Sequence, residues 1–523
     1  MRVIINGGGP VGCMAALIML QYTSDVTIVE RRSDIRIGSI HSGRSINLVL
    51  TSRGLNALQQ VGLKEAALAI TVKVEGRIIH PVDMEYDEEP VFQPYGLDDT
   101  EVNYSISRTK INQLLLQAAE DRGVKILCNY KLTDISFETM TATYTCSHIG
   151  TVTLQADLFI GADGLSSVTR KVMVRQLRAE GIAVTEEIER LGISYKEITF
   201  PSKKTADDNN DNGNSNSNSN GVLKYPMNSR GLHIWPRGVH FLMALADLQP
   251  TFTGTMYLPD GSATINVPEN TEGLPEFEEF TSDPSCIENY VQKYYPDLPH
   301  LVPDYKEQLQ QHPASLLATL HVSHWHHSHR VVLIGDAAHA IVPFFGQGLN
   351  LGFESVMLLD CFLNRHYAFP EEASLARSPR GLELAFEAYE KYHHPSADAI
   401  ANLAKENFVE MSYKVGLAEF RRRKDLEKWI EARYKMKFRS RYFLVTKTLI
   451  PYHLAQKLGS RIDACLTDII NKCDASKVGI DTLSKYEIEA SIDKHITPFL
   501  QANGIHLADH LFNYYPKKHE VCS

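Results

Sequence analysis

The chain begins MRVIINGGGPVGCMAALIMLQYTSDVTIVE over residues 1–30, and this stretch determines the class of fold that we expect. RVIIN is apolar and β-branched, as a buried strand is, and CMAALIMLQ has the composition of a buried helix. DVTIVE is a second strand-like run. A strand, a helix and a second strand in direct succession form a βαβ unit, which predicts a parallel sheet.

The turn of this unit, GGGPVG, places Gly7, Gly9 and Gly12 in the spacing of a dinucleotide-binding fingerprint. Glycines permit a tight turn there, and the amides at the start of the following helix can face a pyrophosphate. Glu30 ends the second strand 18 residues after Gly12, where a carboxylate can accept hydrogen bonds from ribose hydroxyls. The stretch therefore predicts a dinucleotide cofactor held by these four residues.

Two later stretches are compatible with the same cofactor. DLFIGADGLSSVTR, residues 157–170, contains Asp163 and Arg170, but an ordinary strand that ends in a turn explains it equally well. GDAAHAIVPFFGQGLN, residues 335–350, follows the strand-like run VVLI, so Asp336 stands at the carboxyl end of a strand. Open parallel sheets bind ligands at that end. The helix after PFFGQG can also turn its N-terminal amides toward a flat cofactor ring.

The chain divides into three parts by its pattern of predicted strands and helices. Residues 1–75, 100–185 and 325–375 carry the α/β pattern and are expected to form one discontinuous cofactor-binding domain. Residues 76–99 and 186–324 are rich in strands and turns, which predicts a second, antiparallel sheet domain for the substrate. Residues 376–523 have a helical composition. The Asn- and Ser-rich run 203–221 cannot bury a core and is expected to be a disordered insert, with an interaction segment as the alternative.

Composition argues against several classes of protein. The net charge of −10 over 523 residues argues against a nucleic-acid partner. The eight cysteines include no CxxC pair, which argues against a zinc site or a disulfide framework and favours reduced thiols in an intracellular protein. No apolar run of about 18 residues occurs, so no transmembrane helix is predicted. Strand-like sequence follows Met1 directly, so no signal peptide is predicted.

Basic residues and histidines each gather in one part of the chain. The basic stretch 421–461 is interpreted as a solvated helical face, with contact to an anionic membrane surface as the alternative. Five histidines lie close together, at His321, His324, His326, His327 and His329. Their spacing is irregular and no Cys or carboxylate is interleaved, so no metal site is predicted. His339 is interpreted as a structural residue, with a catalytic base as the alternative.

The three motifs, in this order and at these separations, resemble the FAD-dependent aromatic hydroxylases, which are the class A flavoprotein monooxygenases. The resemblance covers most of the chain. It implies a Rossmann-like FAD-binding domain, an antiparallel substrate sheet and a C-terminal helical region. It also implies FAD as the bound cofactor, with O₂ as a substrate and NADPH as a transient co-substrate, because the chain has no second Rossmann unit. The cofactor then carries the chemistry, and the protein positions the ring and excludes water.

Six stretches narrow the resemblance to the members that hydroxylate L-kynurenine to 3-hydroxykynurenine in tryptophan degradation toward quinolinate and NAD. They are GRSINLVLTSRG (43–54), EGRIIH (75–80), YGL (95–97), LHIWPR (232–237), GDAAHAIVPFFGQGLN (335–350) and NFVEMSYKV (407–415). This resemblance assigns the substrate carboxylate to Arg77 and Tyr95, since a planar guanidinium matches both carboxylate oxygens. Asn407, Met411 and Tyr442 are expected to complete the substrate site.

The resemblance also assigns residues around the flavin. Phe345 and Gln347 are expected to flank the flavin and the substrate ring and are the candidate catalytic residues. The implied FAD contacts, besides the glycine turn and Glu30, are Arg44, Asn47, Arg108, Asp336, Gly346, Gly348 and Asn350. Two positions depart from the family pattern: Ser355 stands where an acid is usual, and Lys447 stands where an aromatic residue is expected.

Other functions remain open at this point. A related flavin hydroxylase acting on another aromatic substrate would fit the motifs, although a lipophilic substrate would not need Arg77. A flavin-binding scaffold without turnover would fit the basic stretch and Ser355. Flavin halogenases are excluded because the Trp-x-Trp-x-Ile-Pro signature is absent. The expected location is the cytoplasm or the surface of the mitochondrial outer membrane, by peripheral association.

Overall fold

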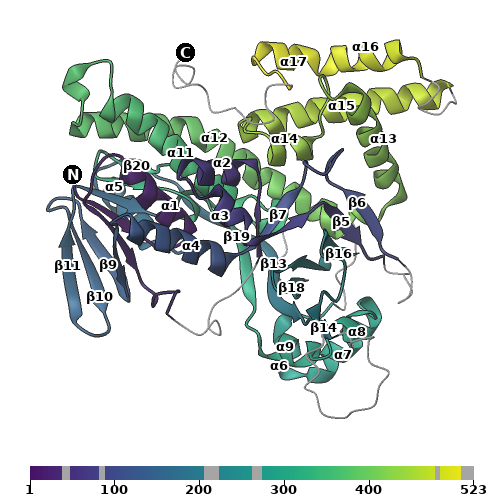
Figure 1. Ribbon diagram of the computed structural model, residues 1–523, viewed down its shortest axis with the longest axis horizontal. Coiled ribbons are helices and arrows are strands. Elements are labelled where there is room, and N and C mark those ends of the chain that lie inside the picture. Colours follow the sequence, from purple (N-terminus) through teal and green to yellow (C-terminus); the bar gives the residue numbers. More distant parts are fainter. Residues whose placement is uncertain (38–46, 82–88, 205–222, 262–273, 477–482, 508–523) are drawn as a thin grey trace, which may run out of the picture.

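The computed structural model describes residues 1–37, 47–81, 89–204, 223–261, 274–476 and 483–507. Two large sheets lie side by side, and helices cover them (Figure 1). The Asn-rich run 203–221 lies outside the described residues apart from Lys203 and Lys204, so its predicted disorder stays a prediction. Only the short strands beside it are described, β14 (Lys203–Lys204) and β15 (Leu223–Lys224), which pair with one another.

The first sheet has six strands in the order β20-β21-β12-β1-β2-β8. Their bounds are His326–His327, Val331–Leu333, Leu158–Gly161, Val3–Asn6, Val26–Glu30 and Lys125–Cys128. Every neighbouring pair is parallel except β20–β21. All four residues of β1 are buried, as expected for a strand covered on both faces by crossover helices. The parallel sheet predicted from residues 1–30 is confirmed.

Helices and a small sheet surround these strands. The helices are α1 (Pro10–Met19), α4 (Arg108–Asp121), α5 (Val168–Ala179), α10 (Asp336–His339) and α11 (Gly348–Leu363), and α1 packs against both α4 and α11. A three-stranded antiparallel sheet, β9 (Tyr130–Ser136), β10 (Thr141–Cys146) and β11 (Gly150–Gln155), extends from the same side of the molecule (Figure 1). The first sheet and its helices share one large apolar core.

The second sheet has seven strands in the order β19-β13-β18-β17-β16-β5-β6. Their bounds are Ser315–Val322, Glu186–Phe200, Phe252–Pro259, His240–Ala246, Gly231–Arg237, Gly76–Ile79 and Val91–Pro94. Neighbours are antiparallel, as predicted, except that β5 pairs with β16 in parallel. Four short helices lie at the lower end of this sheet in Figure 1: α6 (Phe277–Ser282), α7 (Pro284–Tyr294), α8 (Leu298–Leu301) and α9 (Tyr305–Gln311).

A third, small sheet is built from strands on both sides of β5 and β6 in the chain. Its order is β3-β7-β4, with bounds Asn47–Leu50, Asn103–Ser107 and Thr71–Val74, and α2 (Ser52–Gln60) and α3 (Lys64–Leu68) connect β3 to β4. The connection from β21 to α11 contains the 3-10 turn η2 (Pro343–Phe345). After α11 come the short turns η3 (Asn364–Ala368) and η4 (Ala373–Leu375).

The remainder of the described chain is helical, as predicted. We call α12–α17 the C-terminal helices: α12 (Pro379–Ser412), α13 (Ala418–Tyr434), α14 (Arg441–Lys447), α15 (Tyr452–Ser476), α16 (Lys485–His495) and α17 (Thr497–Ala502), with the turn η5 (Lys414–Gly416). Helix α12 reaches from the first sheet to the second, and α13–α17 stand above the second sheet (Figure 1). They share an apolar core with that sheet, in which Ile234 and Phe241 meet Phe408 and Leu458.

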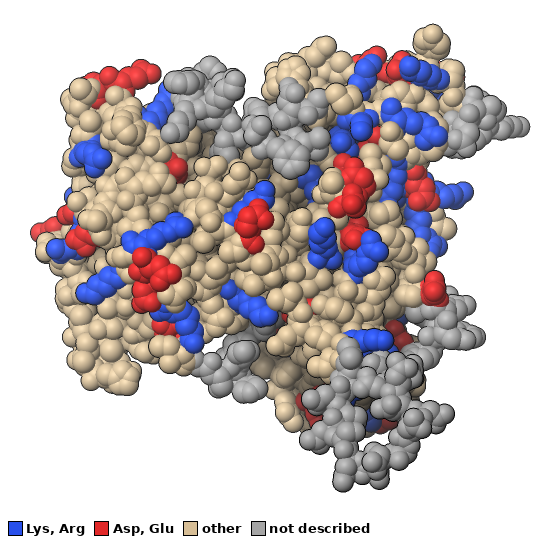
Figure 2. All heavy atoms as spheres, viewed as in Figure 1, with Lys and Arg blue, Asp and Glu red and all other residues tan. Residues whose placement is uncertain are grey.

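The surface carries mixed charge. Lys and Arg side chains are interspersed with Asp and Glu over the visible face (Figure 2). In the basic stretch of α13 and α14, Arg423 pairs with Asp463 at 3.2 Å and Arg441 with Glu406 at 2.9 Å. Among the described residues, no helix has the length and apolar composition needed to cross a membrane. The seven cysteines of the described part carry no disulfide.

Candidate functional site

The glycine turn has the geometry that a dinucleotide requires. Gly7 has a φ of +112°, and a Cβ atom there would lie 2.3 Å from the carbonyl oxygen of Ala162. A Cβ atom on Gly12 would lie 2.0 Å from the carbonyl oxygen of Gly7. A Cβ atom on Gly9, by contrast, would meet nothing within 4 Å. The outer two glycines are thus needed for packing, while Gly9 opens the N-terminus of α1 to a ligand.

Glu30 lies directly beside this turn. Its Oε2 accepts from the amide of Gly8 at 2.8 Å and its Oε1 from the amide of Arg32 at 2.9 Å. A carboxylate oxygen can accept more than one bond, so Glu30 keeps capacity for a ribose hydroxyl. The carboxylate thus holds the turn open toward the end of β2.

Asp336 and Arg108 face the same recess. Asp336 follows β21 and is accessible to water, yet its surroundings desolvate it enough to raise the pKa of its carboxyl, an effect that the charge of Arg108 opposes. A Cβ atom on Gly335 would lie 3.0 Å from Cγ1 of Val11, so Asp336 stands beside the glycine turn; we call the region between Gly9, Asp336 and Gly348 the recess. Gly348, at the N-terminus of α11, also has open space where a Cβ would stand. These residues fit FAD, because the N-termini of α1 and α11 have open space for a ligand and Asp336 stands at the carboxyl end of a strand.

The stretch 157–170 supports this recess without lining it. The Asp163 carboxylate accepts from the amides of Val168 and Thr169 at 2.8 and 3.0 Å, which fixes the start of α5. Arg170 is fully buried, and its guanidinium donates to the carbonyl oxygens of Leu165 at 2.7 Å and Ala337 at 3.0 Å. Arg170 therefore holds the segment that carries Asp336 in place.

The loop 343–350 is shaped by the side chain of Asn350, which is one of the predicted cofactor residues. Nδ2 of Asn350 donates to the carbonyls of Val49 and Gly346, at 2.8 and 3.0 Å. Its Oδ1 accepts from the amides of Thr51 and Gly54, at 2.9 and 3.2 Å. All the hydrogen-bonding capacity of this amide is used. Asn350 therefore shapes the turn at Gly346, whose φ is +64°, and its place beside the cofactor stays a prediction.

Two other predicted residues are partly engaged by the fold. Asn47 donates to the carbonyls of Leu245 and Ala246 at 3.3 and 3.4 Å, which leaves only its buried Oδ1 for a cofactor. Gln347 is fully buried, and its Oε1 accepts from the hydroxyl of Tyr452 at 2.8 Å. Arg44 lies outside the described residues.

Arg77 stands at the centre of the predicted substrate site. It is 8% exposed and lies in β5. Its Nη1 donates to Glu410 at 2.7 Å and its Nη2 to Oδ1 of Asn407 at 3.4 Å. The charges of Lys424 and Arg77 hold the pKa of Glu410 at about 2, against the effect of burial. The guanidinium thus has a partly buried counter-ion on one side, and α12 brings Asn407 to it.

Aromatic rings form the wall beside Arg77. Tyr95 and Tyr442 stack with ring centroids 4.7 Å apart, and Phe345 stacks on Tyr442 at 5.7 Å. The Arg77 guanidinium lies 6.0 and 5.7 Å from the two tyrosine centroids. Met411, predicted from the same helix face as Asn407, is 1% exposed and accepts a contact from the Asn407 amide at 3.3 Å. The structure therefore brings six of the seven predicted substrate and ring residues into one cluster, while Gln347 faces Tyr452.

Arg53 is a buried residue near this site that sequence reasoning missed. Its Nε donates to Glu354 at 2.8 Å, and its Nη1 donates to the carbonyls of Val445 and Thr448 at 2.6 and 3.0 Å. The guanidinium also lies 3.7 Å from the ring centroid of Tyr452. Arg53 therefore joins α2 and α11 to the connection between α14 and α15. In the sequence, Arg53 stands just after a strand-like run, in TSRG, but no neighbouring residue in the chain indicates that its side chain is buried.

Similar buried polar contacts join the first 110 residues to the C-terminal helices elsewhere. Glu101 pairs with Arg439 at 3.0 Å, and both side chains are less than a tenth exposed. Lys447 donates to Asn103 at 2.6 Å. We call this set the polar seam; it comprises the contacts that Arg53, Arg77, Glu101 and Asn103 make with the C-terminal helices.

Ser355, the departure from the family pattern, lies between two buried histidines. Its hydroxyl donates to the carbonyl of Leu351 at 3.0 Å and contacts Nε2 of His339 at 2.7 Å and of His393 at 3.0 Å. Burial lowers the pKa of His339 to about 4, so it stays neutral. This arrangement supports the structural interpretation of His339.

The histidines of residues 321–329 do not converge. His321 lies 3.5 Å from Asp398, whereas His326 pairs with Glu390 at 2.9 Å and His327 with Glu180 at 2.9 Å. Within the described ranges, no group of three or more His, Cys, Asp or Glu side chains could hold a metal ion. These residues instead join β19, β20 and α5 to neighbouring acids.

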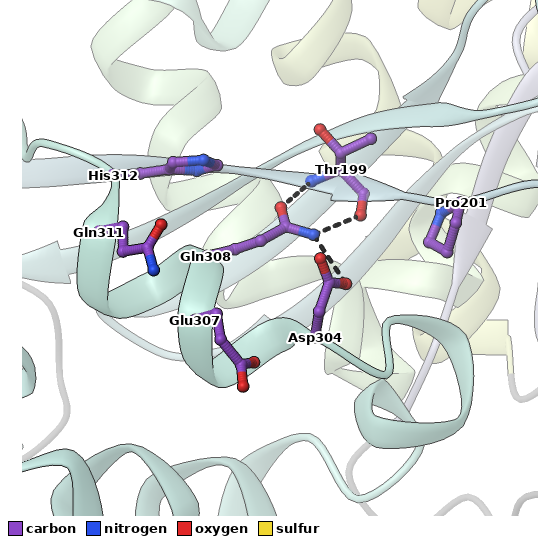
Figure 3. Close-up of a pocket in the computed structure, with 7 residues that line it drawn as sticks. All are labelled: Thr199, Pro201, Asp304, Glu307, Gln308, Gln311 and His312. Atoms are coloured by element: carbon purple, nitrogen blue, oxygen red, sulfur yellow. Dashed lines mark hydrogen bonds between the residues drawn. The ribbon is translucent and has the colours of Figure 1, made fainter.

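A surface hollow of about 390 Å³ lies away from this site, between β13 and α9 (Figure 3). Gln308 spans its floor, accepting from the amide of Thr199 at 2.7 Å and donating to Asp304 at 3.0 Å. The hollow shares no residue with the recess or the Arg77 cluster. We assign no ligand to it.

Known proteins resemble this chain in sequence and in fold. The family described as FAD binding domain matches residues 1–245 and 298–370. The fold and the recess thus define a flavoprotein of that family. The solved structure of 2-methyl-3-hydroxypyridine-5-carboxylic acid oxygenase has the same fold, with a TM-score of 0.55 and 18% identity over 79% of this chain and 92% of that one.

Curated relatives define the family more narrowly. The kynurenine 3-monooxygenase of Myxococcus xanthus (strain DK1622) is 33% identical over 504 residues, which are 96% of this chain and 97% of that protein. The enzyme of the same name from Stenotrophomonas maltophilia (strain K279a) is 34% identical over 450 residues, 86% of this chain and 88% of that protein. This chain belongs to the kynurenine 3-monooxygenase family.

Proposed function

We propose that the protein is an FAD-dependent monooxygenase that hydroxylates L-kynurenine to 3-hydroxykynurenine with NADPH and O₂. The observation that carries the proposal is the cluster of Arg77, Tyr95, Tyr442 and Phe345, which offers a cation and stacked rings in one place. L-Kynurenine has a matching α-amino-acid end and an aromatic ring. The family membership supports the same substrate.

Each side chain in the cluster has a definite task in this proposal. Arg77 donates from Nη1 to Glu410 and from Nη2 to Asn407, and the remaining N–H groups of its guanidinium are those that would bind the substrate carboxylate. Glu410 carries the negative charge that suits the substrate ammonium group. Phe345 and the tyrosines hold the ring and exclude water, since Phe345 is only 9% exposed.

No strong protein base is required for this reaction. FAD, held by the glycine turn, Glu30, Arg108 and Asp336, supplies the electron transfer and oxygen activation when it is bound. The aniline nitrogen of kynurenine already activates the ring carbon next to it. The neutral, hydrogen-bonded state of His339 is consistent with a purely structural part for that residue.

The decisive experiment measures NADPH consumption by the purified, FAD-loaded protein with and without L-kynurenine and identifies the product. Stimulated consumption and a product heavier by one oxygen that co-elutes with 3-hydroxykynurenine are expected. Stimulation without that product would mean that kynurenine only mimics the true substrate. A protein that binds FAD but consumes no NADPH in the presence of any aromatic substrate would contradict the proposal.

A further inference from the structure

Three side chains form a directed hydrogen-bond chain that ends at the proposed substrate site. Nζ of Lys447 donates to Oδ1 of Asn103 at 2.6 Å and also to the carbonyl of Val102. Nδ2 of Asn103 then donates to the hydroxyl oxygen of Tyr442 at 2.6 Å. Lys447 and Asn103 are 8% and 2% exposed, so water does not compete for these groups. The chain connects the end of α14 with the start of β7.

The charge on Lys447 fixes the direction of these bonds. An ammonium group donates and cannot accept, so the oxygen of the Asn103 amide must face Lys447 and the nitrogen must face Tyr442. Tyr442 therefore accepts from Asn103, and its own O–H must point elsewhere. Burial raises the pKa of Tyr442 well above its ordinary value, so the hydroxyl keeps its proton.

The O–H of Tyr442 is turned away from Asn103 and lies on the side of Tyr95 and Arg77. Burial raises the pKa of Tyr95, while the charge of Arg77 and a hydrogen bond from Tyr442 oppose that rise. The ring of Tyr95 stacks on Tyr442 with centroids 4.7 Å apart, and the Arg77 guanidinium lies 5.7 Å from the Tyr442 centroid, so Tyr442 and Arg77 border the same space. A substrate carboxylate bound by Arg77 would meet a donor already aligned, which lowers the cost of ordering the site.

We propose that Lys447 is a positioning residue for the substrate: through Asn103 it turns the Tyr442 hydroxyl proton toward the carboxylate that Arg77 binds. This inference rests on the proposed function, because it takes the kynurenine carboxylate as the acceptor. Lys447 does not touch the substrate itself. Lys447 stands where the family pattern has an aromatic residue, whose contribution would be packing. The lysine contributes instead a hydrogen bond that fixes the orientation of Asn103.

The test uses the FAD-loaded full chain at pH 6.5, where the amine, whose pKa burial lowers to about 7, is mostly protonated. Lys447→Met is expected to raise both the KM and the Kd for L-kynurenine about 5- to 10-fold and to change kcat by less than about 2-fold. Asn103→Asp is expected to act in the same direction. The new carboxylate can only accept, so the Tyr442 hydroxyl would donate to it and point away from the substrate site. Asn103→Asp keeps the contact with Lys447, so it carries the test if Lys447→Met does not fold.

The Tyr442→Phe background separates positioning from a structural effect. There, Lys447→Met and Asn103→Asp are expected to leave the Kd unchanged, because no hydroxyl is left to orient. Equal losses of affinity with and without the hydroxyl would overturn the proposal. If the wild type binds kynurenine and the single variants have the same Kd as the wild type, the role of Lys447 is overturned and the proposed function stands. Absence of kynurenine binding by the wild type would overturn the proposed function as well.

Discussion

The first sheet and the polar seam are held together by opposite means. The first sheet joins β1 to β2 and β12 by regular parallel pairing, and its core residues are apolar, with Val3 and Ile5 fully buried. In the seam, Arg53, Arg77 and Glu101 are each less than a tenth exposed and meet charged or carbonyl groups of the C-terminal helices. One region is stabilised by burial of apolar surface and the other by satisfied charges.

The difference shows where the protein places its specificity. A buried charge costs desolvation unless its partner and its hydrogen bonds are in place. The seam is therefore stable in one arrangement of its groups, and that arrangement surrounds the proposed substrate site. The apolar sheet tolerates small adjustments of packing, but the seam requires each partner.

The largest expected effect is loss of Arg53 from the seam. Arg53→Met should lower the free energy of unfolding by about 3–5 kcal/mol, because it leaves the buried Glu354 carboxylate without its partner. Urea denaturation followed by circular dichroism measures this change. The double variant Arg53→Met with Glu354→Leu is the matched control and should recover part of the loss. Equal stability of Arg53→Met and the wild type would show that the seam does not bear on folding.

The second prediction concerns binding at the seam rather than folding. Arg77→Ala should weaken L-kynurenine binding by about 2–5 kcal/mol, the cost of removing one partner of a buried charge pair. FAD content should not change. Arg230→Ala provides the control, because Arg230 is two-thirds exposed and pairs with Glu75 at the surface. Calorimetric titration that returns a wild-type Kd for Arg77→Ala would exclude the carboxylate-binding role.

The third prediction separates packing from cofactor binding within the first sheet. Gly12→Ala should lower stability by about 1–3 kcal/mol because its Cβ would stand 2.0 Å from the Gly7 oxygen. Gly9→Ala should leave the apoprotein as stable as the wild type and reduce FAD retention. Thermal melting of the apoprotein and the ratio of flavin to protein absorbance measure the two effects. A Gly9→Ala protein that retains FAD fully would remove Gly9 from the cofactor site.

The smallest expected effect is a pH dependence at the contact between α12 and β19. His394 and His321 lie 3.2 and 3.5 Å from Asp398, and hydrogen bonds to Asp398 raise the pKa of both imidazoles. Because the folded state holds these protons more tightly, their stabilisation is present below the ordinary histidine pKa and is lost as the pH rises through the folded values.

Asp398→Asn tests this dependence. The melting temperature of the wild type should fall more between pH 6 and 8 than that of Asp398→Asn, and the two should converge at pH 8. The groups are about a third to a half exposed, so the shift should be small. Parallel profiles for the two proteins would show that this contact does not titrate.

Much of the fold could be predicted because its signals are local. The glycine turn, the strands beside it and Asp336 at the end of VVLIGD depend on neighbouring residues in the chain, and the structure has the same elements. The pairing of β5 with β16 in parallel was not predicted, because the register of strands 150 residues apart depends on tertiary contacts.

The site shows the same division. Resemblance to a family assigned Arg77 and Tyr442 to one site, but it gave no sign that four backbone groups occupy the side-chain amide of Asn350. It also gave no partner for Lys447. Hydrogen-bond saturation is a property of the surroundings, and the sequence names the amide without naming what surrounds it.

The sequence by itself determined the class of fold, the cofactor turn and the type of residue at each place in the site. Local conformational preference and hydrophobic period depend on a few neighbours, and these are visible in the chain. Only the tertiary structure decided that Arg53, Asn103 and Lys447 are buried and paired. Burial removes water as a partner, so the role of a charged side chain depends on which distant group replaces that water.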